Sequence, residues 1–370
     1  MCGINGIFSY NKKNNGEDSI KKMNAALAHR GPDAEGSFQQ ASVALGHRRL
    51  AIIDLDPHSN QPFFSNDKNL VMVYNGEVYN FKEIKEELKE YEFQTTSDTE
   101  VILAAYQKWG LDCFQKFNGM FALAIYDVSK DELLVIRDRL GIKPVYFYTD
   151  KNSFLFSSEI KALLASGKVP KKVDKKSLID YLRYQTVHAP HTIVEGVQMI
   201  PAGHYLIINE EGPHEGCYWK LAEDRANKFL INGEQSAQVQ VKKLFFESVE
   251  RRMIADVPLG AFLSGGIDSS AIVGAMSQLS SRPIKTFSVV FEEEEFSEAK
   301  YARIVADKFK TEHHEIDLKP QVLLDELENA LNFMDHPSGD GINTFVVSKA
   351  TKEAGITVAL SGLGGDELFA

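Results

Sequence analysis

The sequence predicts a sheet-rich α+β domain followed by a parallel α/β domain. Its 370 residues exceed one core of about 150 residues, which suggests two domains. Short strands with a few helices dominate the first half, whereas strands and helices alternate in the second half, as in a doubly wound parallel sheet. A cluster of Glu, Gly and Pro at 209–216 separates the two patterns. We therefore expect domains at residues 2–208 and 233–370, joined by a linker at 209–232.

The first domain is expected to combine strands with a smaller number of helices. β-branched and aromatic residues indicate the strands, and apolar residues at helical spacing indicate the helices. Ser97 and Asp98 form a capping signal before one helix. The expected strands are Ile4–Ser9, Val43–Arg48, Leu70–Tyr74, Phe121–Asp127, Leu133–Arg137 and Val145–Tyr148, and the expected helices are Asp18–Ala28, Phe81–Lys89 and Thr99–Lys108.

The second domain is expected to follow a strand–helix rhythm. Such alternation places parallel strands side by side, with helices on the faces of the sheet. The expected strands are Val257–Leu263, Ile284–Phe291, His313–Ile316 and Thr357–Leu360, and the helices are Gly233–Met253, Ser269–Leu279 and Ser297–Phe309, with two further helices after the third strand.

Composition excludes several classes of protein. With 44% hydrophobic and 25% charged residues, no apolar run of membrane-spanning length and no secretory leader, the chain is expected to be soluble and cytoplasmic, with no membrane partner. The net charge of −11 and the lack of a basic stripe argue against a nucleic-acid partner. Three cysteines are too few for a disulfide framework, and we expect Cys113 and Cys217 to be packing residues.

Cys2 is the candidate nucleophile. Removal of Met1 would leave Cys2 with a free α-amine, whose usual pKa of about 7.7 to 8.0 suits a general base at neutral pH. The thiol and its base would then belong to one residue. An isolated cysteine near the N-terminus is more often a small buried residue, so this prediction depends on the motifs that surround Cys2.

Six short motifs follow one another in the first domain: Met1–Ile4, His29–Asp33, His47–Leu50, Asn75–Asn80, Ser97–Glu100 and Arg137–Gly141. In this order they resemble the class II glutamine amidotransferases, an N-terminal-nucleophile family that cleaves the side-chain amide of glutamine. The resemblance implies an αββα sandwich.

The resemblance also implies roles for five further residues. Asn75 and the N–H of Gly76 would hold the oxyanion that forms during attack by Cys2. Arg49 would bind the carboxylate of glutamine, and Asp98, with Glu77, would bind its ammonium group. A selective pocket for free glutamine needs charges of both signs, so these residue types fit the substrate.

A second candidate site is the segment Ser264–Ser270, Ser-Gly-Gly-Ile-Asp-Ser-Ser, which follows a strand and opens a helix. Such a turn directs backbone N–H groups and the positive end of a helix into one small space, where anions bind. No Gly-Lys-Ser/Thr follows, so the segment is not a Walker A loop. It resembles the pyrophosphate loop of ATP pyrophosphatases, and this resemblance implies that Asp268 binds Mg²⁺.

Leu360–Phe369 forms a glycine-rich motif at another strand end. In a parallel sheet the strand ends share one edge, so Asp366 can share a metal ion with Asp268. With this motif the whole chain resembles the glutamine-hydrolysing asparagine synthetases. The resemblance implies an ATP site formed by Leu263, Ser264, Gly265, Gly266, Asp268, Ser269, Ser270, Val290, Ser361 and Gly362.

The same resemblance implies a reaction, cofactors and partners. ATP with Mg²⁺ would adenylate the side-chain carboxylate of aspartate, and ammonia from glutamine would displace AMP to give asparagine, glutamate, AMP and pyrophosphate. A homodimer is a candidate assembly. The family continues beyond the motif that ends near Ala370, so we expect this synthetase domain to be incomplete at its C-terminus.

Two alternatives stay open. Leu363 stands where these synthetases usually carry an acidic residue, and residues 335–341 lack the cation expected near the aspartate carboxylate. Another acceptor carboxylate, such as a sugar uronate in surface polysaccharide synthesis, therefore remains a candidate. A glutaminase with a nucleotide-sensing domain is a second alternative, against which the intact Ser264, Asp268 and Asp366 argue.

Overall fold

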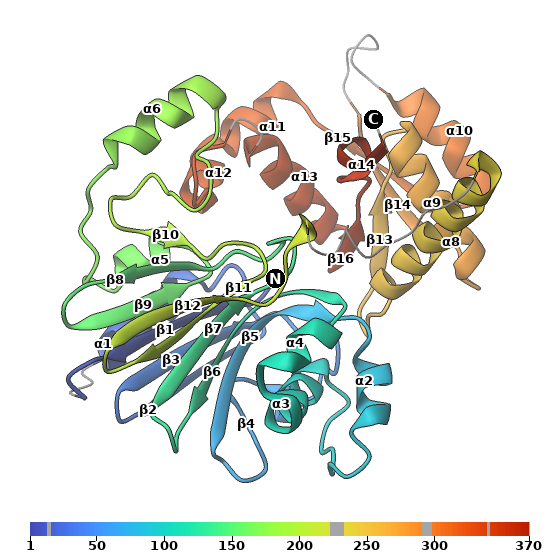
Figure 1. Cartoon of the computed structure of the whole chain (residues 1–370). Helices are drawn as coiled ribbons and strands as arrows, with labels where there is room; N and C mark the ends of the chain where they lie inside the picture. Colours follow the sequence, from blue (N-terminus) through green and yellow to red (C-terminus); the bar gives the residue numbers. More distant parts are fainter. Residues whose placement is uncertain (13–15, 223–232, 291–297, 339–340, 370) are drawn as a thin grey trace. The chain divides into compact units, whose positions relative to one another are not determined.

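The computed structural model describes residues 1–12, 16–222, 233–290, 298–338 and 341–369. Two compact units divide the chain (Figure 1). The first comprises Met1–Lys228 and Asp335–Pro337, and the second comprises Phe229–Met334 and Ser338–Ala370. Each unit is described by itself.

The first unit contains two six-stranded antiparallel sheets. Sheet A has the order β10 (Gln198–Met199), β8 (Tyr146–Thr149), β9 (Ser153–Ser157), β1 (Gly3–Ser9), β3 (Val43–Arg49) and β2 (Ala34–Gln40). Sheet B has the order β12 (Gly212–Cys217), β11 (His204–Asn209), β7 (Glu132–Arg137), β6 (Gly119–Asp127), β5 (Leu70–Val78) and β4 (Phe63–Phe64).

The sheets pack face to face, and helices cover their outer faces. Ile4 and Phe8 of β1 belong to one buried cluster with Val73 of sheet B. The intervening Ile7 points the other way and packs with Met23, as expected from the two-residue period of a strand. Helices α1 (Glu17–Ala26) and α5 (Ile160–Ala165) pack on sheet A, and α3 (Asp98–Trp109) packs on β5 and β4. The expected αββα sandwich is confirmed.

The remaining helices of this unit are short. They are α2 (Phe81–Glu87), α4 (Cys113–Lys116), α6 (Lys175–Tyr184) and two 3₁₀ turns at Pro57–Ser59 and Gly110–Asp112. Ser97 caps α3 as expected, since its hydroxyl accepts a hydrogen bond from the N–H of Thr99 at 3.1 Å.

Residues 209–217 differ from the expected linker. They lie in a hairpin in which β12 pairs with β11 over its whole length. Gly212 has a φ of +115°, and the Gly-Pro sequence begins β12 directly after the turn. The ordered part of the first domain therefore extends past 208, and residues 223–232 of the expected linker lie outside the described residues.

Asp335 belongs with the first unit although it is distant in sequence. Its carboxylate accepts hydrogen bonds from the N–H groups of Ile160 at 2.7 Å and Lys161 at 2.9 Å, at the start of α5. Burial raises the pKa of Asp335 to about 6, while the two N–H groups act in the opposite direction.

The second unit is built on a four-stranded parallel sheet, as expected. The strand order is β15 (Glu312–Asp317), β14 (Lys285–Val290), β13 (Leu259–Phe262) and β16 (Val358–Leu360). The chain moves outward in one direction from β13 to β15 and returns to the other side of β13 at β16. Ligands of open α/β sheets bind at such a reversal.

Helices connect and flank these strands. The connecting helices are α9 (Ile267–Leu279), α10 (Ala299–Phe309), α11 (Pro320–Asp325), α12 (Leu327–Phe333) and α13 (Gly341–Glu353), while α8 (Glu234–Arg252) precedes β13 and α14 (Gly365–Phe369) follows β16. Across the described parts of both units, none of the helices combines the length and the apolar character that crossing a membrane requires.

Candidate active site

Cys2 lies directly before β1, and three hydrogen bonds fix it. Its Sγ donates to the Leu50 carbonyl at 3.6 Å and accepts from the Leu50 N–H at 3.4 Å, and its carbonyl accepts from Nε of Arg30 at 2.9 Å. Burial raises the pKa of the Cys2 thiol, while the Leu50 hydrogen bond and the positive charges of the N-terminus, Lys143 and Arg49 act to lower it. The hydrogen bond and the positive charges around the thiol thus only partly offset the effect of burial.

Met1 is present in this chain, and its α-amine is also buried. Burial, together with the charges of Arg30 and Lys143, lowers the pKa of this amine from its usual 8.0 to about 5. Burial in this pocket therefore favours the neutral, proton-accepting form of the Met1 amine.

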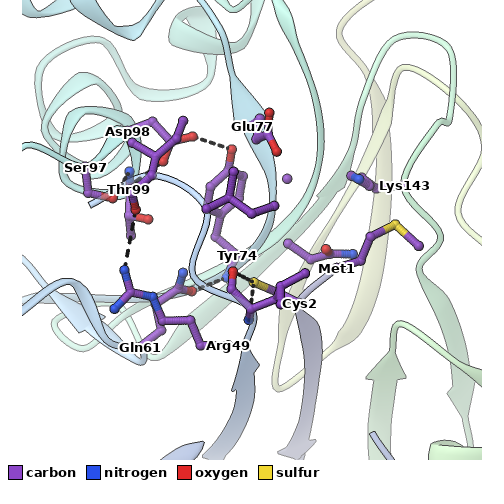
Figure 2. Close-up of a pocket in the computed structure, with 15 residues that line it drawn as sticks. Met1, Cys2, Arg49, Gln61, Tyr74, Glu77, Ser97, Asp98, Thr99 and Lys143 are labelled. Atoms are coloured by element: carbon purple, nitrogen blue, oxygen red, sulfur yellow. Dashed lines mark hydrogen bonds between the residues drawn. The ribbon is translucent and has the colours of Figure 1, made fainter. Parts of the chain in front are cut away.

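A pocket opens beside Cys2 (Figure 2). It contains all the residues predicted from the sequence for catalysis and glutamine binding. Its lining consists of Met1, Cys2, Arg49, Leu50, Ile52, Ile53, Gln61, Tyr74, Asn75, Gly76, Glu77, Ser97, Asp98, Thr99 and Lys143.

Asn75 and Gly76 lie next to each other on β5. The Asn75 Nδ2 atom is buried and has no hydrogen-bond partner. A buried amide N–H group without a partner costs about 1 to 3 kcal/mol. Nδ2 of Asn75 is therefore available to donate a hydrogen bond to a ligand in the pocket. A side chain at Gly76 would place Cβ 2.2 Å from the Met120 carbonyl oxygen and 2.7 Å from Cα of Phe121. Only glycine fits where β5 meets β6.

Asp98 and Glu77 give the pocket its negative charge. The Asp98 carboxylate accepts hydrogen bonds from the Tyr74 hydroxyl at 2.8 Å and the Val78 N–H at 3.0 Å. Burial raises the pKa of Asp98, and these hydrogen bonds act in the opposite direction. Glu77 lies on β5 and is 8% exposed. A ligand ammonium placed between them would stabilise both ionised carboxylates.

Arg49 holds the loop that borders the pocket. Its Nη1 donates to the Asp56 carbonyl at 2.9 Å and to Oδ1 of Asn60 at 2.7 Å, and its Nη2 donates to the carbonyls of Ile53 and Asp54. The guanidinium lines the pocket while these contacts are in place, so a ligand carboxylate would share it with the loop.

A cluster of charges anchors the N-terminal segment from behind. Glu159 accepts hydrogen bonds from Nη1 of Arg30 at 2.9 Å and Nε2 of His29 at 3.0 Å, and Lys161 lies 3.1 Å from its other oxygen. Burial alone would raise the pKa of Glu159, but these partners outweigh it and lower the pKa to about 2. Since Arg30 also holds Cys2, the cluster positions the nucleophile.

Sequence reasoning missed several pocket residues, and only some of them carried a signal. Lys143 follows the recognised Arg137–Gly141 motif by two positions, which could have identified it. Gln61 has no comparable signal, although its Oε1 accepts the Tyr74 N–H at 2.6 Å. The expectation for Cys217 is wrong, because this residue is exposed, whereas Cys113 is buried as expected.

In the second unit, Ser264–Ser270 forms the expected turn between β13 and α9. Gly265 has a φ of +88°, and a side chain there would collide with Tyr301 at 2.6 Å. The hydroxyls of Ser264 and Ser269 lie 3.1 Å apart, and the Ser264 hydroxyl accepts the Gly266 N–H at 3.3 Å. These contacts set the shape of the turn.

The second glycine-rich motif lies against the first. A Cβ on Gly365 would fall 2.3 Å from Cγ of Asp268, and one on Gly362 would fall 2.9 Å from Cβ of Asp268. Asp366 stands in the first turn of α14. The two motifs therefore meet where β13 and β16 end side by side, as the sequence predicted.

The other expected ATP residues flank this place. Val290 ends β14, and the Ser361 hydroxyl accepts the Leu363 N–H at 3.3 Å. The Leu263 side chain is buried in the core, so Leu263 can face a ligand only through its backbone. Over the residues that the structure describes, no group of three or more His, Cys, Asp or Glu could hold a metal ion. Asp268 and Asp366 offer carboxylate oxygens, the type of protein ligand that Mg²⁺ takes together with phosphates and water.

Comparison with known proteins divides the chain in the same way. A glutamine amidotransferase domain family matches residues 1–219, and an asparagine synthase family matches residues 240–370. A putative glutamine-hydrolysing asparagine synthetase 2 of Methanocaldococcus jannaschii is 40% identical over the whole chain, which covers 75% of that protein.

Two glutamine-hydrolysing asparagine synthetases of Bacillus subtilis also match over the whole chain. Synthetase 1 is 37% identical and synthetase 3 is 32% identical. The chain spans 58% and 63% of their respective lengths.

Proposed function

The chain belongs to the family of glutamine-hydrolysing asparagine synthetases, and on this premise we propose that it takes ammonia from glutamine and transfers it to a carboxylate activated by ATP. Aspartate is the proposed acceptor and asparagine the product. The observation that carries the first half of the proposal is the unpartnered Asn75 amide in the pocket that contains Cys2.

The proposed glutaminase step begins after removal of Met1. The free α-amine of Cys2 accepts the thiol proton, and the thiolate attacks the amide carbon of glutamine. Nδ2 of Asn75 and the N–H of Gly76 stabilise the oxyanion. The ammonium form of the α-amine returns its proton to the leaving nitrogen, which departs as ammonia, and water then hydrolyses the thioester to glutamate.

Glutamine is proposed to bind through its two charged ends. Arg49 binds the α-carboxylate and also holds the loop around it, so binding and pocket shape depend on one guanidinium. Asp98 and Glu77 bind the ammonium group. Their buried position strengthens these charge-assisted hydrogen bonds relative to exposed ones.

The second unit is proposed to bind ATP with Mg²⁺. The N–H groups of the Ser264–Ser270 turn would bind phosphates, and Asp268 and Asp366 would hold the metal ion, which would neutralise phosphate charge. Val290, Ser361 and Gly362 border the nucleoside part. The α-phosphate of ATP reacts with the acceptor carboxylate, pyrophosphate leaves, and ammonia displaces AMP. We also propose that the protein works in the cytoplasm, where ATP and both amino acids are available.

The test separates the two half-reactions. Cys2→Ala should abolish glutamate release and glutamine-dependent asparagine formation, and it should preserve asparagine formation from added ammonium. Cys113→Ala is a matched control, because it removes a buried thiol outside the pocket. Loss of the ammonium-dependent reaction in a folded Cys2→Ala protein would contradict the two-site scheme. AMP release with a uronate and none with aspartate would show that the acceptor is a uronate and not aspartate.

A further inference from the structure

Lys143 is a buried cation to which neither the family comparison nor the proposed mechanism gives a role. Its side chain is 6% exposed and lines the glutamine pocket. Figure 2 shows its amine on the same side of the pocket as Met1 and Glu77. Within the described parts of the chain, Nζ has no hydrogen bond and no ion pair. Lysines are almost never fully buried unless paired, so this arrangement calls for a function.

The protein fixes the backbone of Lys143 from both sides. Asp138 accepts the Lys143 N–H at 2.9 Å, and Nε of Arg137 donates to the Lys143 carbonyl at 2.8 Å. Gly141, with a φ of +67°, completes the loop, and a Cβ there would lie 2.9 Å from Cζ of Arg137. The Arg137–Gly141 motif therefore positions Lys143 at the pocket.

The charged groups around Lys143 come from four parts of the first unit. Burial lowers the pKa of Lys143, and the positive charge of Arg30 lowers it further. The negative charges of Glu77 on β5 and Asp138 after β7 act to raise it. In return, the positive charge of Lys143 acts to lower the pKa of the Cys2 thiol and of the Met1 α-amine. Lys143 thus lines the same pocket as Cys2, and among the described residues Nζ forms no ion pair that would hold the charge elsewhere.

We propose that Lys143 is a positioning residue whose ammonium charge favours the Cys2 thiolate as glutamine is attacked. This inference rests on the proposed glutaminase function and adds a residue to it. Lys143 acts through Cys2 and exchanges no proton with the substrate. The thiol proton moves to the α-amine and then to the departing ammonia, as described above.

Alkylation of Cys2 by iodoacetamide tests the proposal without requiring any glutaminase activity. The protein carries Cys217→Ser to remove the exposed thiol, and mass spectrometry verifies that Met1 is absent. The rate is measured against pH for Lys143, Lys143→Met, Lys143→Gln and Lys143→Arg. Lys172→Met is the matched control, because Lys172 pairs with Glu195 on the exposed surface.

The neutral variants should alkylate about tenfold more slowly at pH 7, with the midpoint about one pH unit higher, and Lys143→Arg should restore most of the rate. In glutaminase assays kcat should fall about tenfold in the neutral variants, and KM should change less than threefold. Unchanged alkylation profiles in Lys143→Met or Lys143→Gln would overturn the inference.

Two controls keep the outcomes distinct. Unfolding of both neutral variants at 25 °C, detected by circular dichroism, would also overturn the inference, since it would assign Lys143 to stability. Normal Cys2 alkylation in a protein that releases no glutamate would contradict the proposed function and leave the role of Lys143 standing.

Discussion

Replacement of Glu159 by Gln should make the stability of the first unit much less dependent on pH. The substitution keeps the shape of the side chain and removes its charge. Glu159 is 5% exposed and faces His29, Arg30 and Lys161. At pH 7 the variant leaves these cations without their common carboxylate.

The pKa of Glu159 gives the magnitude. It falls from the usual 4.5 to about 2 in the folded protein. At about 1.4 kcal/mol for each pKa unit, this corresponds to roughly 3 kcal/mol of stability. Because the folded-state pKa is lowered, the contribution is fully present above pH 4.5 and is lost as the pH falls toward 2. The difference between wild type and variant should therefore be largest at neutral pH and should shrink with acid.

The assay is unfolding in urea followed by tryptophan fluorescence at pH 7, 4 and 3. Both tryptophans of the chain, Trp109 and Trp219, lie in the first unit, so the signal reports on that unit. Glu87→Gln is the control, because Glu87 pairs with Lys116 at an exposed position and should change stability by less than about 1 kcal/mol.

A destabilisation by Glu159→Gln that stays constant from pH 7 to pH 3 would refute the electrostatic explanation. Glutaminase activity gives a second measurement. Since Arg30 bridges Glu159 and the Cys2 carbonyl, kcat should fall about tenfold in the variant. Full activity would show that Cys2 does not depend on this cluster.

Three further predictions concern the two sites. Gly76→Ala should reduce glutamate release more than a hundredfold, because Cβ would lie 2.2 Å from a backbone oxygen, and a fully active variant would remove Gly76 from the oxyanion site. Tyr74→Phe removes a hydrogen bond to the buried Asp98, so KM for glutamine should rise about tenfold with kcat nearly unchanged; an equal fall of kcat instead would point to a role in the chemical step. Asp268→Asn should abolish ATP–pyrophosphate exchange and leave glutamate release intact, whereas retained exchange would exclude Asp268 as a metal ligand.

The pocket residues were predicted through the resemblance of six ordered motifs to the class II glutamine amidotransferases. Taken singly, charged residues such as Glu77 and Asp98 are more often surface residues than ligands. Lys143 was missed because a single lysine in a loop is usually an exposed surface residue. Its backbone is held by a hydrogen bond donated by Arg137 and one accepted by Asp138, and only the folded loop brings these groups together.

The fold was predicted best where packing imposes a regular spacing of apolar residues along the sequence. Strand β1 alternates between two apolar environments, and its boundaries were nearly correct. Strand β2, Ala34–Gln40, was missed because it lies at the edge of its sheet and most of its side chains are polar. The hairpin at 209–217 was assigned to a linker because its glycine and proline are equally typical of loops. In both places pairing with a neighbouring strand determines the structure.

The position of Asp335 makes the first unit discontinuous in sequence. A gene fragment that stopped after residue 228 would encode every strand of both sheets and would still lack the carboxylate that binds the first amides of α5. Those amides, on Ile160 and Lys161, directly follow Glu159, which holds the arginine behind Cys2. Expression boundaries drawn from sequence motifs would therefore separate the nucleophile from part of its support. An excised glutaminase should be supplied with residues 335–337, for example as a peptide or through a shortened connection.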